Sequence, residues 1–226
     1  MKFTSSKKQV VAMKVLVIIL FICFIFPLPC LASYQFFKMA EQWPPTFCRN
    51  KHCSVIPPGK FTIHGLWPSN QTSLRSPKCV TKDPQLQKFT KAMISKLETQ
   101  LDLSWPNLKG QSNEQFWAYE WNAHGICSSN MFNQTQYFEL ALNIWSRYDL
   151  FDILKQEGIS PGIKVSYDIT KIRNAIRKHI NLNVFPQIHC VNSELLEIRL
   201  CLDQSGNTYI RCPTPGNCGN TVLWEP

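Results

Sequence analysis

The stretches FTIHGLWP at residues 61–68 and FWAYEWNAHGIC at residues 116–127 carry most of the structural information in this sequence. Each places one histidine, His64 or His124, directly before a glycine and among large aromatic side chains. The ordinary pKa of histidine lies near neutrality, so its side chain can both accept and donate a proton. Two such groups, one neutral and one charged, are sufficient to cleave RNA by acid–base chemistry without a metal ion.

The second stretch predicts a helix. Glu120 lies four residues before His124, which places both on one face, where Glu120 can accept a hydrogen bond from the imidazole or hold its cation. Trp117 and Trp121 occupy the neighbouring stripe and are candidates to wall the site. Gly125 is expected to end the helix in the left-handed conformation that glycine adopts most cheaply.

The first stretch predicts a short strand, because its apolar residues alternate with other residue types. His64 then projects from the face opposite Phe61 and Ile63. A histidine on a strand and another on a helix can converge on a single phosphate group.

The first 32 residues have the pattern of a secretory signal peptide. Four lysines and no acidic residue occupy residues 1–14, an apolar run covers 15–26, and small residues stand at Cys30 and Ala32. The alternative, a membrane anchor, requires about 20 apolar residues. We therefore expect cleavage after Ala32, a secreted, extracellular product, no membrane attachment after cleavage, and one catalytic domain over residues 33–226.

The chain is basic, with a formal net charge of +9. Removing the four lysines of the signal segment lowers this charge to +5. A moderate basic excess suits a polyanionic substrate, although many secreted proteins are basic.

Eight cysteines lie beyond the signal segment, and an even number in a secreted chain predicts disulfides. The spacing favours a local Cys48–Cys53 loop. It also favours a Cys201–Cys212 bridge nested inside Cys190–Cys218, which leaves Cys79 and Cys127 to pair. A zinc site at Cys48, His52 and Cys53 is the alternative, but it lacks a second ligand pair at finger spacing. Sequons for N-glycosylation begin at Asn70 and Asn133.

The expected elements follow one another as strands, then helices, then strands. Strands are predicted at 34–43 and 61–67. Helices are predicted from Asp83-Pro84 to Trp105-Pro106, over 114–124, over most of 135–156, and after an Asp168 cap. Strands return at 195–202 and 208–211. This order favours a single α+β domain with an antiparallel central sheet and segregated helices.

The two signature stretches resemble the active-site signatures of the ribonuclease T2 family. The opening YQFFKMAEQWPPTFC, the segment SWPN at residues 104–107 and the cysteine layout resemble plant members, the S-ribonucleases of self-incompatibility and their S-like relatives. The similarity runs from about Tyr34 to the last cysteine. It implies a disulfide-stapled T2-like fold.

The resemblance also implies a mechanism. His124 is expected to be the general base on the ribose 2′-hydroxyl, His64 the acid that protonates the 5′-oxygen, and Glu120 an assistant near the phosphate. The implied product is a 2′,3′-cyclic phosphate, made from single-stranded RNA without a metal or other cofactor. The 2′-hydroxyl makes the reaction specific for RNA over DNA.

Substrate-binding residues are expected around this centre. Trp67 can stack on a base, although a structural core tryptophan is the alternative. Gln42 and Asn107 are expected at a second base pocket. The chain departs from the family pattern at two positions. Tyr119 replaces a common histidine but can still bind substrate through a hydrogen bond to a phosphate, and Ala123 replaces a common lysine that stabilises charge in the transition state. Losing such a donor can cost about 10²–10³ in rate.

Four functions are consistent with these observations. The first is a secreted monomeric endoribonuclease, and the second is a pistil S-ribonuclease that also contacts pollen-side recognition proteins. The third is an S-like ribonuclease for phosphate scavenging or defence, and the fourth is a catalytically weakened RNA-binding or storage homologue, motivated by Ala123. The basic charge favours the S-ribonuclease over its S-like relatives.

Overall fold

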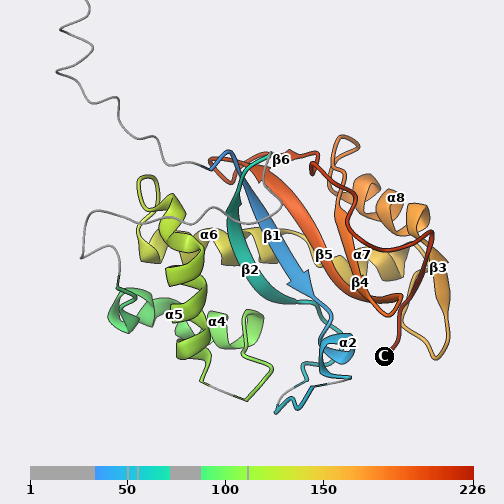
Figure 1. Ribbon diagram of the computed structural model, residues 1–226, viewed down its shortest axis with the longest axis horizontal. Coiled ribbons are helices and arrows are strands. Elements are labelled where there is room, and N and C mark those ends of the chain that lie inside the picture. The colour runs from blue at the N-terminus through green and yellow to red at the C-terminus, as the bar shows by residue number, and fades with distance from the viewer. Residues whose placement is uncertain (1–33, 50, 55, 72–87, 111) are drawn as a thin grey trace, which may run out of the picture. The chain divides into compact units, whose positions relative to one another are not determined.

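Three long strands from the two ends of the chain lie side by side (Figure 1). In this computed structural model, which describes residues 34–226 except 50, 55, 72–87 and 111, β1 (Phe36–Gln42) lies between β2 (Thr62–Ser69) and β5 (Glu194–Asp203). Both pairings are antiparallel. The two strands predicted at the start of the chain and the one predicted at 195–202 are therefore confirmed.

Four shorter strands extend the sheet. Strands β4 (Gln187–Val191) and β6 (Tyr209–Ile210) pair with β5, while β7 (Thr221–Leu223) joins β5 to β3 (Ser166–Asp168). The β5–β7 contact is parallel, at one pair of residues, and the other pairings are antiparallel. The predicted α+β class with a mainly antiparallel sheet is confirmed, although β3 and β7 were not predicted as strands.

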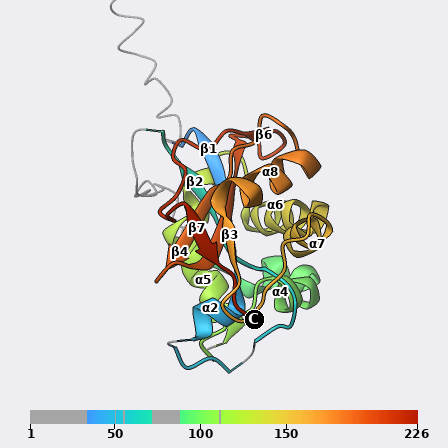
Figure 2. The same ribbon diagram turned by 90° about the vertical axis from the view of Figure 1, so that its right-hand side faces the viewer.

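Alternation along β5 divides the sheet into two chemically different faces. Ile198 and Leu200 point into the hydrophobic core, whereas Glu197 and Arg199 belong to the opposite face. Helices α6 (Gln134–Arg147) and α7 (Leu150–Gln156) lie behind the sheet in Figure 1, and Figure 2 shows them on one side of the strands. The polar face is thus left for the candidate site.

Polar side chains begin four of the helices by accepting a backbone N–H. Ser112 caps α5 (Asn113–Ala123), Asn133 caps α6 through a capping box, Asp149 caps α7, and Asp168 caps α8 (Ile169–His179) as predicted. The single helical segment predicted over 135–156 is two helices, because Tyr148 and Asp149 are extended. The remaining short elements are α2 (Pro44–Cys48), η1 (Lys91–Leu97), α4 (Glu98–Ser104) and η2 (Gly125–Ser128).

The helix predicted to begin at Asp83-Pro84 is only partly an α-helix in the residues that the structure describes. Its predicted start lies outside the described residues. From Lys91 the chain forms a 3₁₀ turn before α4, and the helix stops at Ser104, as the following Trp105-Pro106 predicts.

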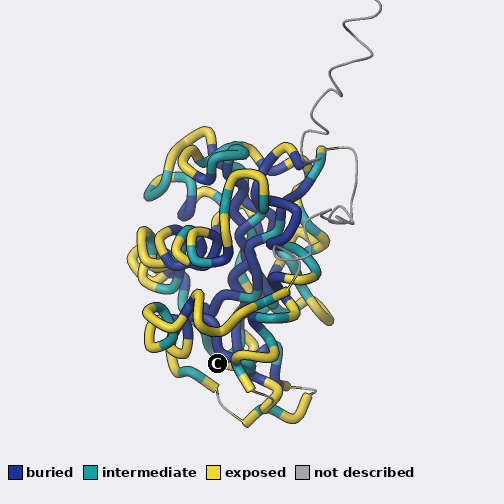
Figure 3. Tube along the Cα trace, turned by 90° about the vertical axis from the view of Figure 1, so that its left-hand side faces the viewer, coloured by how far each residue is buried: buried dark blue, intermediate teal, exposed yellow. Residues whose placement is uncertain are grey.

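Aromatic side chains from distant parts of the chain join in one core. Figure 3 shows the buried segments gathered in the interior, with exposed segments around them. Trp43 follows β1 and packs edge-on against Trp224 near the C-terminus, with ring centroids 5.3 Å apart. The Trp43 indole N–H donates to the carbonyl of Glu225 at 2.7 Å. These contacts join the two ends of the described fold.

Three disulfides are formed as the spacing predicts: Cys48–Cys53, Cys190–Cys218 and Cys201–Cys212. The zinc alternative is therefore wrong, because both of its cysteine sulfurs are in one disulfide. Cys127 is also disulfide-bonded. The predicted partner, Cys79, lies outside the described residues. Among the helices of the described part, none is long and apolar enough to cross a membrane.

Candidate active site

A β-bulge presents the first signature histidine. The register of β1 and β2 passes from Ala40 opposite Gly65 to Glu41 opposite Ile63, so His64 is the extra residue. Bulges break the regular alternation and re-aim a side chain. The indole N–H of Trp105 holds the bulge by donating to the His64 carbonyl at 3.0 Å. The strand prediction is confirmed, but the bulge, rather than simple alternation, sets the direction of His64.

His64 forms an ion pair with a residue that the sequence interpretation missed. Its Nδ1 lies 2.5 Å from Oε1 of Glu197, a buried carboxylate on β5. The other carboxylate oxygen accepts from Arg199, at 2.6 Å from Nη2 and 2.8 Å from Nε. Burial disfavours the His64 cation, but the hydrogen bond and charge of Glu197 and the charge of Glu120 outweigh it and raise the pKa of His64.

His124 lies where α5 ends and has the opposite electrostatic environment. Its backbone N–H still bonds the carbonyl of Glu120 at 3.0 Å, but its φ of −133° is no longer helical. Among the described residues, its buried Nδ1 has no hydrogen-bond partner. Burial, followed by the charge of His64, lowers the pKa of His124 to about 4. At neutral pH, His124 is therefore neutral, while the neighbouring His64 holds its proton more strongly than an ordinary histidine.

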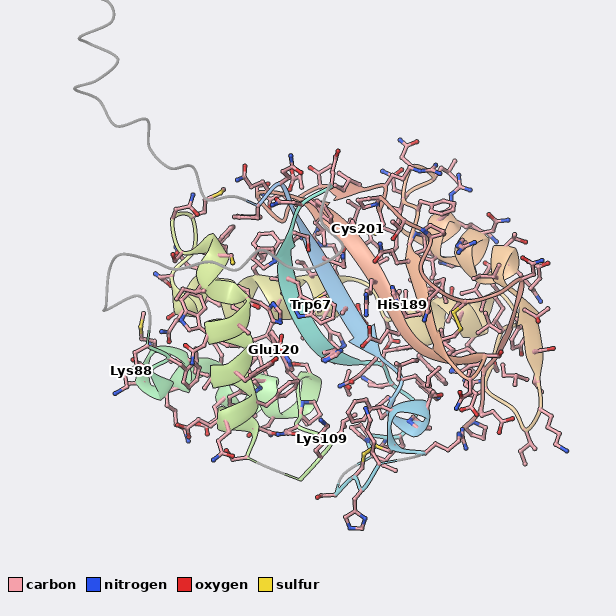
Figure 4. The ribbon with its side chains drawn as sticks, viewed as in Figure 1. Trp67, Lys88, Lys109, Glu120, His189 and Cys201 are labelled. Atoms are coloured by element: carbon pink, nitrogen blue, oxygen red, sulfur yellow. A yellow bond between two sulfur atoms is a disulfide. The ribbon has the colours of Figure 1, made fainter. Side chains whose placement is uncertain are left out.

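Trp67 lies next to both histidines. Its ring centroid is 5.2 Å from that of His64 and 5.7 Å from that of His124. Its indole N–H donates to Glu120 Oε2 at 3.0 Å, and the Arg199 guanidinium lies 5.0 Å from its ring. Trp67 is half-buried, so part of its ring is open to stack on a base, and its stacking role stays a prediction. Figure 4 shows it on β2, between Glu120 on α5 and the strands β1 and β5.

The predicted bond between Glu120 and the His124 side chain is not formed. The helix ends at Ala123, so the imidazole leaves the helical stripe, and Glu120 binds Trp67 instead. Burial raises the pKa of Glu120 to about 7, against the opposing effects of the His64 charge and the Trp67 hydrogen bond. Glu120 is consequently close to half-protonated at neutral pH.

Two other details of the second signature differ from expectation. Trp117 and Trp121 do not wall the site; both are buried in the core. Gly125 is not in the left-handed region. It is required instead by close packing, because a Cβ there would lie 2.6 Å from the Trp121 ring and 2.9 Å from the Tyr137 ring.

A cavity of about 390 Å³ opens beside His64 and Glu120. The predicted substrate-binding residues Gln42, Asn107 and Tyr119 all line it, whereas Trp67 and His124 are not among its lining residues. Gln42 is buried and its Oε1 has no hydrogen-bond partner in the described part of the chain. The other lining residues were not predicted to bind substrate: Phe47, Leu108, Lys109, Gln115 and Phe116.

The remaining histidines lie outside this centre. His52 is exposed in the loop closed by Cys48–Cys53, and His179 pairs with Glu157 at 2.9 Å. His189 is on β4, opposite Glu197 in the sheet. In the described ranges, no group of three or more His, Cys, Asp or Glu side chains is arranged to hold a metal ion.

The predicted glycosylation residues both lie at the end of an element, Asn70 after β2 and Asn133 before α6. Asn70 lies directly after β2 and is half-buried. Asn133 is exposed, and its side-chain oxygen caps α6 by accepting from the N–H of Gln136 at 2.9 Å. Its amide nitrogen is not needed for this cap.

Known proteins are similar to this chain in sequence and in fold. The model of the ribonuclease T2 family matches residues 34–212. Extracellular ribonuclease LE of Solanum lycopersicum is 35% identical over 205 residues, which are 84% of this chain and 86% of that protein. Ribonuclease S-7 of Nicotiana alata is 32% identical over 210 residues, or 90% of this chain and 93% of that protein.

A solved structure agrees with these matches. Ribonuclease MC1 from the seeds of bitter gourd superposes with a TM-score of 0.74 at 30% identity, over 84% of this chain and 100% of its own. The matched region contains both histidine signatures, the bulge at His64 and the ion pair with Glu197. The chain therefore belongs to the ribonuclease T2 family and is an endoribonuclease of the T2 type.

Proposed function

We propose that the protein cleaves single-stranded RNA by metal-independent transesterification, with His124 as general base and His64 as general acid. The observation that carries this assignment is that the pKa values of two histidines, both beside Trp67, are shifted in opposite directions. His124 has a pKa lowered to about 4, and the ion pair raises that of His64. One group is ready to accept a proton while the other is ready to donate one.

The reaction conserves protons. His124 takes the proton of the ribose 2′-hydroxyl, and the 2′-oxygen attacks phosphorus. The bond from phosphorus to the 5′-oxygen breaks, and the leaving oxygen takes a proton from His64. The products are a 2′,3′-cyclic phosphate and a 5′-hydroxyl. DNA is not a substrate, because it lacks the attacking hydroxyl.

The surrounding residues bind the substrate in this proposal. Glu120, tethered to the indole of Trp67, lies beside His64 and can donate a hydrogen bond to a phosphate oxygen when it is protonated. The half-buried ring of Trp67 offers a face on which a base can stack. Gln42 and Asn107 supply polar groups to the neighbouring cavity, which fits a second base, and the exposed Tyr119 stands at its edge.

Digestion of an RNA oligonucleotide by the purified protein, followed by end-group analysis, tests the mechanism. We expect cyclic phosphate ends, and we expect the same rate with EDTA. Replacing His64 or His124 by alanine should remove turnover, whereas His52→Ala serves as an exposed control with wild-type activity. Products with 5′-phosphate ends, or activity lost on chelation, would exclude this mechanism.

We infer that the protein reaches the extracellular space. The support is the charged, then apolar, then small-residue pattern of residues 1–32, together with the similarity to extracellular ribonuclease LE. N-linked glycans at Asn70 and Asn133 fit this route. N-terminal sequencing and glycosidase treatment of the secreted product test cleavage after Ala32 and both glycans.

We further propose a role in pollen rejection, as an S-ribonuclease that meets pollen-side recognition proteins. The basic charge supports it, which is still +5 without the four lysines of the signal segment, as does similarity to Ribonuclease S-7. The S-like alternative is favoured if expression is found outside the pistil. A purified protein that binds RNA without cleaving it would instead support the weakened homologue suggested by Ala123.

A further inference from the structure

Three charged side chains, Arg199, Glu197 and His64, contact one another in sequence from β5 to the bulge, and the proposed reaction gives Glu197 and Arg199 no role. Glu197 is buried, with 3% of its surface exposed. Its two carboxylate oxygens are divided between two cations: Oε1 contacts His64 and Oε2 contacts Arg199. A buried carboxylate is costly unless both oxygens are paired, so the fold holds Glu197 in place through these contacts.

The geometry also fixes which nitrogen of His64 carries a proton. An ionised carboxylate is only an acceptor, so the 2.5 Å contact requires Nδ1 to be the donor. The second ring nitrogen, Nε2, is not used by Glu197. A neutral imidazole held in this way keeps its proton on Nδ1, and the proton that can leave the cation is the one on Nε2.

We propose that Glu197 is the positioning residue of the general acid, and that it orients the His64 ring so that Nε2 delivers the proton to the leaving 5′-oxygen. This inference rests on the proposed function of His64. As the bond to phosphorus breaks, the Nε2 proton moves to the 5′-oxygen, and neutral His64 keeps its Nδ1–H bonded to Glu197. Glu197 stays ionised throughout, and Arg199 holds its second oxygen.

The groups that face His64 determine how the pH profile responds. Glu197 and Arg199 come from β5, Glu120 from α5, and His124 from the end of α5. Both carboxylates favour the His64 cation, while Arg199 opposes it. Because His64 acts in its protonated form, its pKa sets the alkaline limb of the profile of kcat/KM against pH.

Glu197→Gln tests the proposal, because the amide keeps the shape and removes the charge. The pKa of His64, followed by NMR titration, should fall, and the alkaline limb should move to lower pH by about one unit. Cleavage of RNA should fall roughly tenfold to hundredfold, less than the roughly 10²–10⁴-fold of general acid catalysis as a whole, because His64 itself is kept. The rate at which the variant cleaves a nucleoside 3′-(4-nitrophenyl phosphate) should fall by less than about threefold, because the leaving group of this substrate needs little protonation.

Two further variants control the result. Glu194→Gln removes an ion pair with Arg49 at the start of the same strand. It should leave the cleavage rates of both substrates and the pH of the alkaline limb unchanged. Arg199→Gln keeps the carboxylate and removes a cation that opposes the His64 charge, so the limb should move to higher pH. If Glu197→Gln does not fold, the direction in which Arg199→Gln moves the alkaline limb tests the proposal instead.

The proposal is overturned if Glu197→Gln leaves the His64 titration and the alkaline limb where they were, or if both substrates lose rate equally. It is also overturned if Arg199→Gln shifts the limb to lower pH or not at all. The proposed function fails separately, if the wild-type protein does not cleave RNA. The NMR titration would still measure the effect of Glu197 on His64 in that case.

Discussion

Gly65→Ala is expected to damage both the stability and the activity of the protein. Gly65 lies on β2, directly after the bulge, where the Trp67 side chain crosses it to reach Glu120. An added Cβ would lie 2.1 Å from Trp67 Nε1 and 2.4 Å from Glu120 Oε2. Both side chains must move, and their 3.0 Å hydrogen bond cannot survive.

The cost follows from the two interactions that are lost. A hydrogen bond to a charged or buried carboxyl contributes about 1.5–3 kcal/mol, and overpacking a tight site costs about 1–3 kcal/mol. We expect a loss of roughly 2–5 kcal/mol, which for a domain of this size lowers Tm by roughly 5–15 °C. We also expect kcat/KM for RNA to fall at least tenfold, because two site residues are displaced together.

Thermal unfolding and steady-state cleavage of a dinucleotide measure the two effects. Gly219→Ala is the matched control, because nothing lies within 4 Å of the place that its Cβ would take, and its φ is not in the left-handed region. If Gly65→Ala melts within about 1 °C of this control and cleaves RNA at the wild-type rate, the tight crossing at Gly65 is not what holds Trp67 and Glu120 together.

Three other predictions can be checked with the same protein. The profile of kcat/KM against pH should rise through the pKa of His124, lowered to about 4, and fall through the pKa of His64, which the ion pair raises; an acidic limb at or above the ordinary pKa of histidine would contradict the environment assigned to His124. Ala123→Lys should raise kcat about tenfold by adding positive charge beside the phosphate, and an unchanged kcat with intact folding would mean that another cation already serves there. Replacing Cys201 and Cys212 together by serine should lower the free energy of unfolding by about 2–4 kcal/mol, measured by denaturant titration; an unchanged midpoint would show that this bridge constrains nothing.

Local signals predicted the local structure well. Alternation identified β2, the aromatic-rich opening segment identified β1, and Asp168 marked the start of α8. The two histidines and the cavity residues Gln42 and Asn107 followed from short motifs. Each of these signals is contained within a few neighbouring residues.

The missed parts of the site depend on pairing between distant segments. Glu197 lies 133 residues after His64, and only the β1–β5 register brings them together. In sequence, Glu197 is one charged residue within an alternating strand. The bulge is equally hidden, because it is a mismatch between two strands rather than a pattern in either one. The wrong Glu120–His124 pairing arose because the helix was extended by one residue too many.

The position of β5 also has a consequence for biosynthesis. His64 is made early, but its carboxylate partner is on a strand near the end of the chain, and Trp43 finds Trp224 only two residues before the last one. Domains assemble as units during synthesis, and contacts between distant segments form last. A nascent chain that lacks β5 therefore has both histidines but not their assembled arrangement. A ribosome making this nuclease, with its own RNA close by, therefore carries a chain without the assembled site until β5 has been made.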